Sequence, residues 1–247
     1  DLSTSLLKYG RAYIKRGIKL KANKQVGAAS GKPIHDAKPY AIFDFDGTLV
    51  DSTSLWSNLA SNFIRSKGLT LSIDIDNIVK TMSLEQAIEY ILLHFDLKMT
   101  ADEIKKEILK KIEEHYFHHV PLKPFVAEYL DYLKNDGVKM CIATASEYHH
   151  VVAALKRLQV EHYFDFVSTC SDLHLGKDDE QFFHEVIKRW NASPSEAIVY
   201  EDALHVIKTA NRIGFYTIGV YDPSAAMDED LIKKIANQYI FSFKEIL

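Results

Sequence analysis

The sequence predicts an α/β fold, in which a doubly wound, Rossmann-like parallel sheet has an inserted all-helical cap and a basic N-terminal extension. Two observations predict the sheet. After residue 40, short apolar runs alternate with amphipathic helical patterns, and the runs are continuously apolar, as in strands buried on both faces. A third observation predicts the cap, because residues 53–119 contain helical patterns but no good strand.

The runs expected to form strands are Tyr40–Phe43, Val138–Ala143, Phe164–Val167, Ala197–Tyr200 and Tyr216–Val220. Apolar residues recur at helical spacing in four segments between them, which begin at Val126, Val151, Phe182 and Ala203. Helices should therefore cover both faces of one parallel sheet.

The helical segment divides the predicted core in the sequence. We expect a core of residues 40–52 and 120–247 and a cap of residues 53–119, with Pro121 and Pro124 marking the return of the chain. A cap inserted after the first strand lies over the carboxyl edge of the sheet. Open α/β sheets bind their ligands at that edge.

Residues 1–39 differ from the rest in charge. They contain nine Lys and Arg against two Asp, a balance of +7, which leaves −11 for the remaining chain if the total is −4. Gly27–Pro33 is typical of a flexible linker. The extension could lie on an anionic lipid surface, contact a protein partner, belong to a missing domain, or fold against the acidic remainder.

Composition excludes several classes of protein. The mildly negative net charge argues against nucleic acid as a partner. No apolar run approaches the roughly 18 residues of a membrane span, and no signal-peptide pattern opens the chain. Cys141 and Cys170 lack metal-ligand spacing, so we expect them to be reduced. The expectation is a cytoplasmic, monomeric protein.

The run Asp44-Phe45-Asp46-Gly47-Thr48 follows the first predicted strand. Residues two apart point to the same side of an extended chain, so Asp44 and Asp46 can face one substrate. One carboxylate could attack phosphorus while the other protonates the leaving oxygen and later deprotonates water. The same run is also typical of an ordinary Asp-Gly turn.

Polar residues recur just past the later strands, namely Thr144, Ser146, Lys177, Glu201 and Asp202. A phosphoryl group needs hydroxyl and N–H donors for its oxygens and a cation to offset their charge. Attack of a carboxylate on a phosphate dianion suffers charge repulsion, which Mg²⁺ relieves through hard oxygen ligands. Asp44, Asp202 and Glu201 could supply such ligands, with Asp46 contributing its carbonyl oxygen.

Four motifs together resemble those of the haloacid dehalogenase-like (HAD) hydrolase superfamily, in the branch with a small helical cap. Asp44–Ser52 matches the first motif, Ala143–Ser146 resembles the second, Gly176-Lys177 the third and Glu201–Ala203 the fourth. The resemblance covers residues 40–247.

The resemblance implies a role for each motif residue. Asp44 would be the nucleophile that becomes an aspartyl phosphate, and Asp46 the general acid and base. Phosphate would be bound by Thr144, Ala145 and Lys177, and Mg²⁺ by Asp44, Asp46, Glu201 and Asp202. Relatives that cleave carbon–halogen or carbon–phosphorus bonds lack the second aspartate. The expected enzyme is therefore a phosphatase acting on a small organic phosphate monoester.

Two positions depart from the family pattern. Asp178–Gln181 follow Lys177 where the family continues with Pro-x-Pro-Asp, and we expect these acidic groups to be solvated at a helix N-terminus. Phe125 stands where a glycine is usual after the hinge proline.

Two alternative functions remain open. A sugar phosphomutase such as β-phosphoglucomutase has the same core motifs. Such mutases resemble one another in having a His, a Gly and an Arg in the cap. The corresponding positions in this sequence are Trp56, Thr81 and Leu84. Without that Arg the cap lacks a clamp for a second phosphate, which favours a phosphatase. The other alternative is a non-catalytic binding protein with a HAD core, although every catalytic position is filled.

Substrate choice is expected to depend on four cap residues, Trp56, Met82, Ser83 and Glu85. Two histidine-rich places also invite a functional interpretation. His115–His119 could suggest a metal site, but a packing or surface role is favoured. Glu147, His149 and His150 open a core helix near the site and are candidates for substrate contact.

Overall fold

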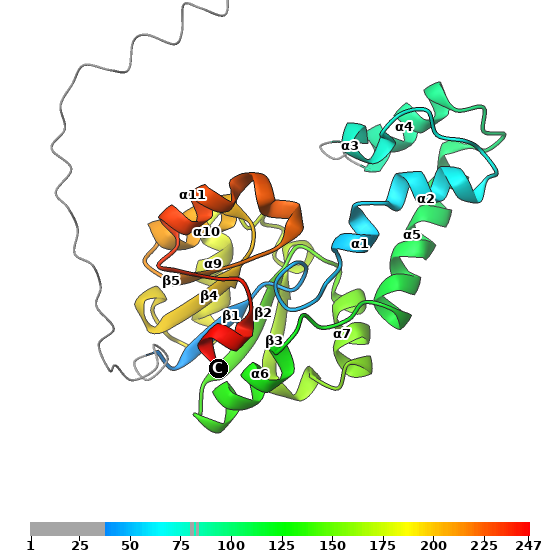
Figure 1. The fold of residues 1–247 in the computed structure, drawn as a ribbon. Coiled ribbons are helices and arrows are strands. Elements are labelled where there is room, and N and C mark those ends of the chain that lie inside the picture. Colours follow the sequence, from blue (N-terminus) through cyan, green and yellow to red (C-terminus); the bar gives the residue numbers. More distant parts are fainter. Residues whose placement is uncertain (1–37, 80–81, 83) are drawn as a thin grey trace, which may run out of the picture. The chain divides into compact units, whose positions relative to one another are not determined.

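Six parallel strands form one sheet in the computed structural model, which describes residues 38–79, 82 and 84–247 (Figure 1). They are β1 (Tyr40–Phe43), β2 (Lys139–Thr144), β3 (Phe164–Thr169), β4 (Ala197–Glu201), β5 (Tyr216–Val220) and β6 (Gln238–Ile240). Their order is β3-β2-β1-β4-β5-β6, and every neighbouring pair is parallel. The predicted doubly wound sheet is confirmed, and β6 is an additional edge strand that the sequence analysis missed.

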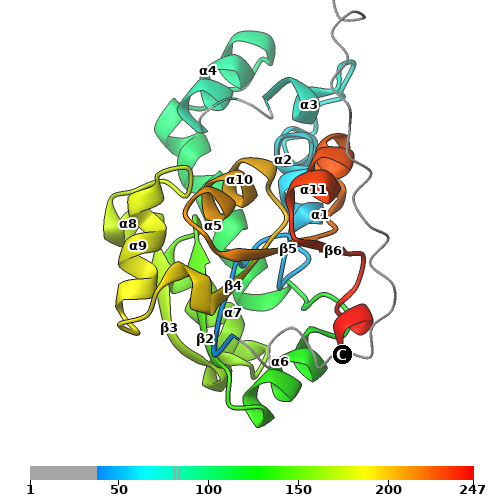
Figure 2. The same cartoon turned by 90° about the vertical axis from the view of Figure 1, so that its left-hand side faces the viewer.

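Helices cover both faces of this sheet. They are α6 (Val126–Asn135), α7 (Tyr148–Arg157), α8 (Cys170–Leu173), α9 (Glu180–Lys188), α10 (Leu204–Arg212) and α11 (Glu229–Ile235). Residues of α6 and α7 share a core with Ala41 and Phe43 of β1, whereas α9 and α10 share a second core with Ile42. Successive strand residues point to opposite faces, so β1 is buried on both. Helices α10 and α11 lie side by side near β5 (Figures 1 and 2).

Between β1 and α6, the described residues 53–79, 82 and 84–119 form helices joined by turns and loops. The helices are α1 (Thr53–Trp56), α2 (Leu59–Ser66), α3 (Ile75–Val79), α4 (Leu84–His94) and α5 (Ala101–His118). Helix α5 begins with a capping box in which Thr100 and Glu103 each accept a backbone N–H from the other. Burial of Ile104, Ile108 and Ile112 confirms the predicted apolar face.

Two neighbouring segments join the helical part to the sheet. Asp51 donates its N–H to the carbonyl of Pro121 at 3.0 Å, and Lys123 donates its N–H to the carbonyl of Leu49 at 2.9 Å. The outgoing and returning segments are thus hydrogen-bonded to each other. Phe125 follows with a φ of 66°, in the left-handed region that glycine adopts at the lowest cost. This conformation explains why a glycine was expected at this position.

Three other expectations have different outcomes. Cys141 and Cys170 are both free, as predicted. Within the described residues, the helices are too short or too polar to cross a membrane. The basic extension falls almost entirely on residues 1–37, which lie outside the described residues, so its contact with lipid or protein stays a prediction.

Candidate active site

Polar side chains from three strands meet at the carboxyl edge of the sheet. Asp44 directly follows β1, Thr144 ends β2 and Glu201 ends β4. Strand β1 pairs with both β2 and β4, and the strand order reverses between β1 and β4. The crevice at such a reversal is where doubly wound sheets bind their ligands.

Lys177, in the loop between α8 and α9, bridges two carboxylates at this edge. Its Nζ donates to Asp44 Oδ1 at 2.6 Å and to Glu201 Oε2 at 2.5 Å, and all three residues are buried. Burial by itself would lower the pKa of Lys177, but the charges of Asp44 and Glu201 outweigh it and raise that pKa. The ammonium group therefore stays charged.

Asp44, Glu201 and Asp202 form a buried carboxylate cluster, in which one oxygen of each residue lies within 4.8 Å of the other two. Burial, and after it the charge of Glu201, raises the pKa of Asp44 to about 7. Burial followed by the charges of Glu201 and Asp44 also raises the pKa of Asp202. Lys177 thus leaves part of the negative charge unbalanced. Clustered carboxylate oxygens with excess negative charge fit Mg²⁺, which prefers hard oxygen ligands.

The turn after β1 brings Asp202 close to the first motif. Gly47 has a φ of 76°, and a Cβ atom at this position would lie 2.7 Å from Asp202 Oδ2. Thr48 Oγ1 donates to Asp202 Oδ1 at 3.1 Å. Gly47 is therefore needed both for its left-handed backbone and for the close approach of Asp202.

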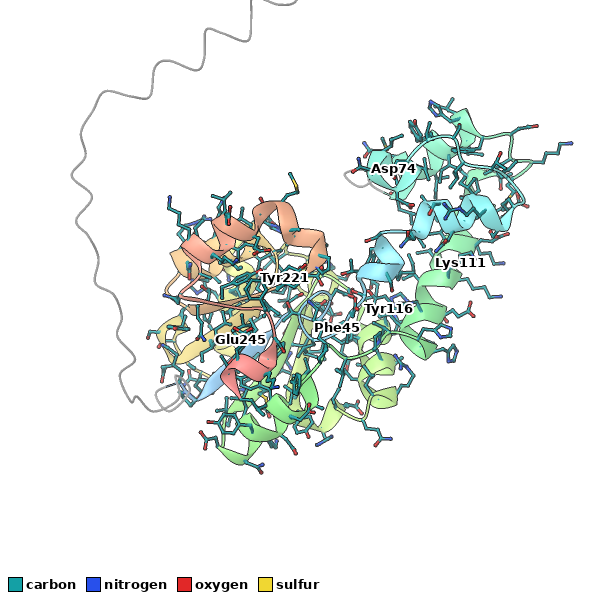
Figure 3. All side chains as sticks on the ribbon, viewed as in Figure 1. Phe45, Asp74, Lys111, Tyr116, Tyr221 and Glu245 are labelled. Carbon is teal, nitrogen blue, oxygen red and sulfur yellow. The ribbon has the colours of Figure 1, made fainter. Side chains whose placement is uncertain are left out.

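The side chain of Asp46 lies outside the carboxylate cluster and is held by two hydroxyl groups. Tyr116 Oη donates to Oδ1 at 2.6 Å, and Ser146 Oγ donates to Oδ2 at 2.5 Å. Tyr116 comes from α5 and lies near Phe45, with ring centroids 6.3 Å apart (Figure 3). Burial and the charge of Asp46 raise the pKa of Tyr116, so its hydroxyl keeps the proton that it donates.

Sequence reasoning missed Tyr116 as a partner of Asp46. The two residues are 70 positions apart, and Tyr116 belongs to the run His115–His119 that we expected to have a packing or surface role. Its burial could have been inferred, because Tyr116 continues the spacing of four residues that runs through Ile108 and Ile112 on α5. The contact with Asp46 has no signal in the sequence.

The residues expected to bind phosphate lie at the same edge as Asp44. Thr144 is buried, and its Oγ1 accepts the N–H of Ser146 at 3.0 Å. Ala145 between them is exposed. The structure brings Thr144 and Lys177 toward the nucleophile position, and their contact with phosphate stays a prediction.

The cap residues expected to select the substrate have different positions. Trp56 Nε1 donates to Tyr116 Oη at 3.3 Å, so Trp56 reaches the surroundings of Asp46. Glu85 forms an ion pair with Lys105 at 2.7 Å. Met82 is half-buried, and Ser83 lies outside the described residues. A role in substrate selection stays a prediction for all four cap residues.

The acidic run after Lys177 forms the start of α9. Asp178 and Asp179 are exposed, and the side chain of Asp179 accepts the N–H of Gln181 at 2.9 Å. Glu180 pairs with Arg212 at 3.1 Å. The prediction of solvated carboxylates at a helix N-terminus is confirmed.

Comparison with known proteins agrees with this geometry. A family model described as "Haloacid dehalogenase-like hydrolase" matches residues 41–220. The chain belongs to this family. The matched range contains all four motifs, from Asp44 to Asp202, so the resemblance inferred from them is confirmed.

Curated relatives of this HAD hydrolase include phosphatases and a mutase. The phosphorylated carbohydrates phosphatase of Thermotoga maritima is 23% identical over 212 residues, which cover 83% of this chain and 98% of that protein. The β-phosphoglucomutase of Bacillus subtilis is 25% identical over 203 residues, which cover 77% of this chain and 87% of that protein. The expected enzyme class, a HAD-like phosphatase, is confirmed.

Solved structures confirm the fold. One crystal structure from Thermotoga maritima, provisionally described as a β-phosphoglucomutase, matches with a TM-score of 0.73 and 23% sequence identity. The match covers 84% of this HAD hydrolase and 96% of that chain. At this identity the likeness concerns the fold alone.

Proposed function

We propose that this chain is an Mg²⁺-dependent phosphatase that hydrolyses a small organic phosphate monoester through an aspartyl phosphate on Asp44. The supporting observation is that the two carboxylates of the first motif have different surroundings. Asp44 lies in the carboxylate cluster against Lys177, whereas Asp46 lies outside it and accepts two hydroxyl hydrogen bonds. This difference suits a nucleophile and a separate acid and base.

In the first half of the reaction, a carboxylate oxygen of Asp44 attacks phosphorus. The bond from phosphorus to the ester oxygen breaks, and Asp46 gives its proton to that leaving oxygen. In the second half, Asp46 takes a proton from water as the water oxygen attacks phosphorus. The bond from phosphorus to Asp44 then breaks, which releases inorganic phosphate and restores both carboxyl groups.

The chain's own residues orient these steps. Lys177 holds Asp44 and offers positive charge to the phosphate oxygens, while Thr144 and Ala145 supply further donors. Tyr116 and Ser146 fix the orientation of Asp46. Tyr116 is a positioning residue, because it acts on the substrate through Asp46.

The carboxylate cluster would hold the metal. Asp44, Asp202 and Glu201 would supply carboxylate ligands, and the backbone carbonyl of Asp46 would supply a further oxygen. Glu201 accepts the N–H of Ala203 at 3.0 Å with one carboxylate oxygen and a hydrogen bond from Lys177 with the other. The contact with Ala203 fixes the carboxylate, which in turn orients Lys177. When bound, Mg²⁺ offsets the repulsion between Asp44 and the phosphate dianion.

The helical segment 53–119 is proposed to act as a cap that selects the leaving group over a core of residues 40–52 and 120–247. Trp56 is the cap residue with the best structural support, because it contacts Tyr116. A cytoplasmic, monomeric state stays a prediction.

Release of inorganic phosphate from a panel of sugar phosphates, nucleotides and phosphoglycolate tests the function. Wild-type protein should release phosphate from at least one of these with Mg²⁺ and not after chelation. Asp44→Asn should abolish release while leaving the folded state intact. A wild-type protein without activity toward the whole panel would favour the non-catalytic alternative.

Similarity to the Bacillus subtilis β-phosphoglucomutase keeps a mutase as the second candidate. A hexose 1-phosphate distinguishes the two activities. A phosphatase yields inorganic phosphate, whereas a mutase yields the hexose 6-phosphate.

A further inference from the structure

A second group of possible metal ligands lies where α5 contacts α7. Glu113 comes from α5, and His149 and His150 come from the first turn of α7. One side-chain ligand atom of each residue lies within 4.8 Å of the other two. These residues are separate from the carboxylate cluster at the edge of the sheet.

His150 is a buried imidazole that lacks a polar partner. Its residue is only 8% exposed, and neither ring nitrogen has a hydrogen-bond partner in the part of the chain that the structure describes. The ring stacks on Tyr116 with centroids 5.2 Å apart and an angle of 7° between the planes. The ring nitrogens are not enclosed by other described residues, so an ion from solvent can reach them.

Exposed side chains complete the group. Glu113 and His149 are both exposed, and the imidazoles of His149 and His150 have centroids 4.1 Å apart. Exposed side chains can change rotamer at little cost, so the ligand atoms can close around an ion. Each of the three residues then supplies one atom.

We propose that Glu113, His149 and His150 bind a divalent transition-metal ion of the zinc type. Two imidazole nitrogens and one carboxylate oxygen are a common ligand set for Zn²⁺, with water at the fourth position. The same set is poorly suited to Mg²⁺, which takes oxygen ligands. This site therefore differs in chemistry from the one proposed at Asp44 and Asp202.

The bound ion joins α5 to α7. Because His150 stacks on Tyr116, and Tyr116 donates to Asp46, the ion also restrains the residue that positions the proposed acid and base. Zn²⁺ at this site would thereby influence a reaction that requires Mg²⁺ at Asp44 and Asp202. Binding can be measured without turnover, so the inference stands or fails independently of the proposed function.

Calorimetric titration of the full chain with Zn²⁺, in excess Mg²⁺, tests the proposal. The exposed pair Glu113→Gln and His149→Gln removes two ligands without altering a buried side chain. The double variant should bind one Zn²⁺ fewer than wild type, or bind it at least about 100-fold more weakly, since even residues that only support ligands cost about 10–100-fold. His184→Gln, an exposed histidine on α9, is the matched control and should bind as wild type does.

Two further measurements complete the test. Thermal unfolding without metal should be the same for the double variant and wild type, which shows that the variant is folded. Hydrogen exchange at the contact of α5 with α7 should slow on adding Zn²⁺ to wild type and not to the double variant. Equal Zn²⁺ stoichiometry and affinity in wild type and the double variant would overturn the proposal.

Discussion

Asp44 and Lys177 illustrate how burial and charge together define this site at the scale of single residues. Lys177 donates to both Asp44 and Glu201, and Asp202 lies close by. The single positive charge of Lys177 therefore offsets only part of the negative charge of three carboxylates. The raised pKa values of Asp44 and Asp202 show that the site resists holding all its negative charge without a further cation.

Stability without metal should therefore depend on the ionisation of Asp44. Its pKa rises from 3.8 to about 7 in the folded protein, so folding favours the protonated form. That contribution is complete below pH 3.8 and is lost as pH rises toward 7. In a chelator, wild type should lose thermal stability over this range relative to Asp44→Asn, and added Mg²⁺ should restore more stability above pH 7 than below it. Parallel pH profiles for the two proteins would contradict this.

Tyr116 gives a second prediction at the same scale. A hydrogen bond to a charged acceptor contributes about 1.5–3 kcal/mol. Tyr116→Phe should therefore lower kcat by about tenfold to a hundredfold. KM should change little, because Tyr116 contacts Asp46 rather than the phosphate. Steady-state kinetics on the best substrate of the panel measures both constants.

Tyr163→Phe is the matched control for this variant. Tyr163 donates to Asp131 at 2.6 Å, the same distance as in the pair Tyr116 and Asp46. Loss of the hydrogen bond between Tyr163 and Asp131 should leave kcat unchanged. If both variants reduced kcat equally, Tyr116 would have only a structural role.

The sequence predicts the motif residues better than their partners. Asp44, Lys177 and Asp202 were found because each follows a recognisable strand or belongs to a short motif. Tyr116 and the pairing of Ser146 with Asp46 were not found, because these contacts depend on how separate elements pack.

At the scale of elements, the turn after β1 gives a third prediction. Gly47→Ala places a Cβ atom 2.7 Å from Asp202 Oδ2, whereas Gly137→Ala, at a similar φ of 78°, meets nothing within 4 Å. Both substitutions should cost about 1–2 kcal/mol of stability from left-handed backbone strain. Only Gly47→Ala should also raise the Mg²⁺ concentration needed for half-maximal activity, because it displaces Asp202. Denaturant unfolding and metal titration of activity measure the two effects.

Element prediction succeeded where the periodic signal was long. The strands β1 and β5 match their predicted bounds, and the predicted helices around Val126, Val151, Phe182 and Ala203 are all present. Strand β6 was missed because its three residues are too few to show a periodic pattern. The left-handed conformation of Phe125 had no signal in the residue itself, and only the glycine that is usual at this position in the family pointed to it.

At the scale of the whole molecule, Asp222 connects the start of the helical segment and the returning segment to the sheet. It follows β5 and accepts from Thr53 Oγ1 at 2.8 Å, and it pairs with Lys123 at 2.8 Å. Burial would raise the pKa of Asp222, but hydrogen bonds from Lys123 and Ser224 outweigh it and lower that pKa. The ionised Asp222 therefore stabilises the folded protein above the ordinary aspartate pKa of 3.8, and this contribution is lost as the pH falls below that value.

Asp222→Asn should therefore destabilise the protein by about 3 kcal/mol, because it leaves Lys123 without its buried counter-charge. It should also increase hydrogen exchange at the backbone amides of residues 49–53, Leu122 and Lys123. Glu229→Gln, which removes an exposed pair with Lys233, is the control and should cost less than about 1 kcal/mol. Denaturant unfolding at neutral pH compares the two, and equal costs would refute a connecting role for Asp222.

The proposed mechanism requires Asp44 to become phosphorylated during turnover. The most direct measurement is rapid acid quenching of the enzyme during turnover of a substrate labelled in its phosphate group, followed by mapping of the labelled residue. We expect label on Asp44 in wild type and no label in Asp44→Asn. Label should accumulate in Asp46→Asn if loss of the general base slows hydrolysis more than attack. Undiminished phosphate release by Asp44→Asn, or label on another residue, would contradict the proposed mechanism.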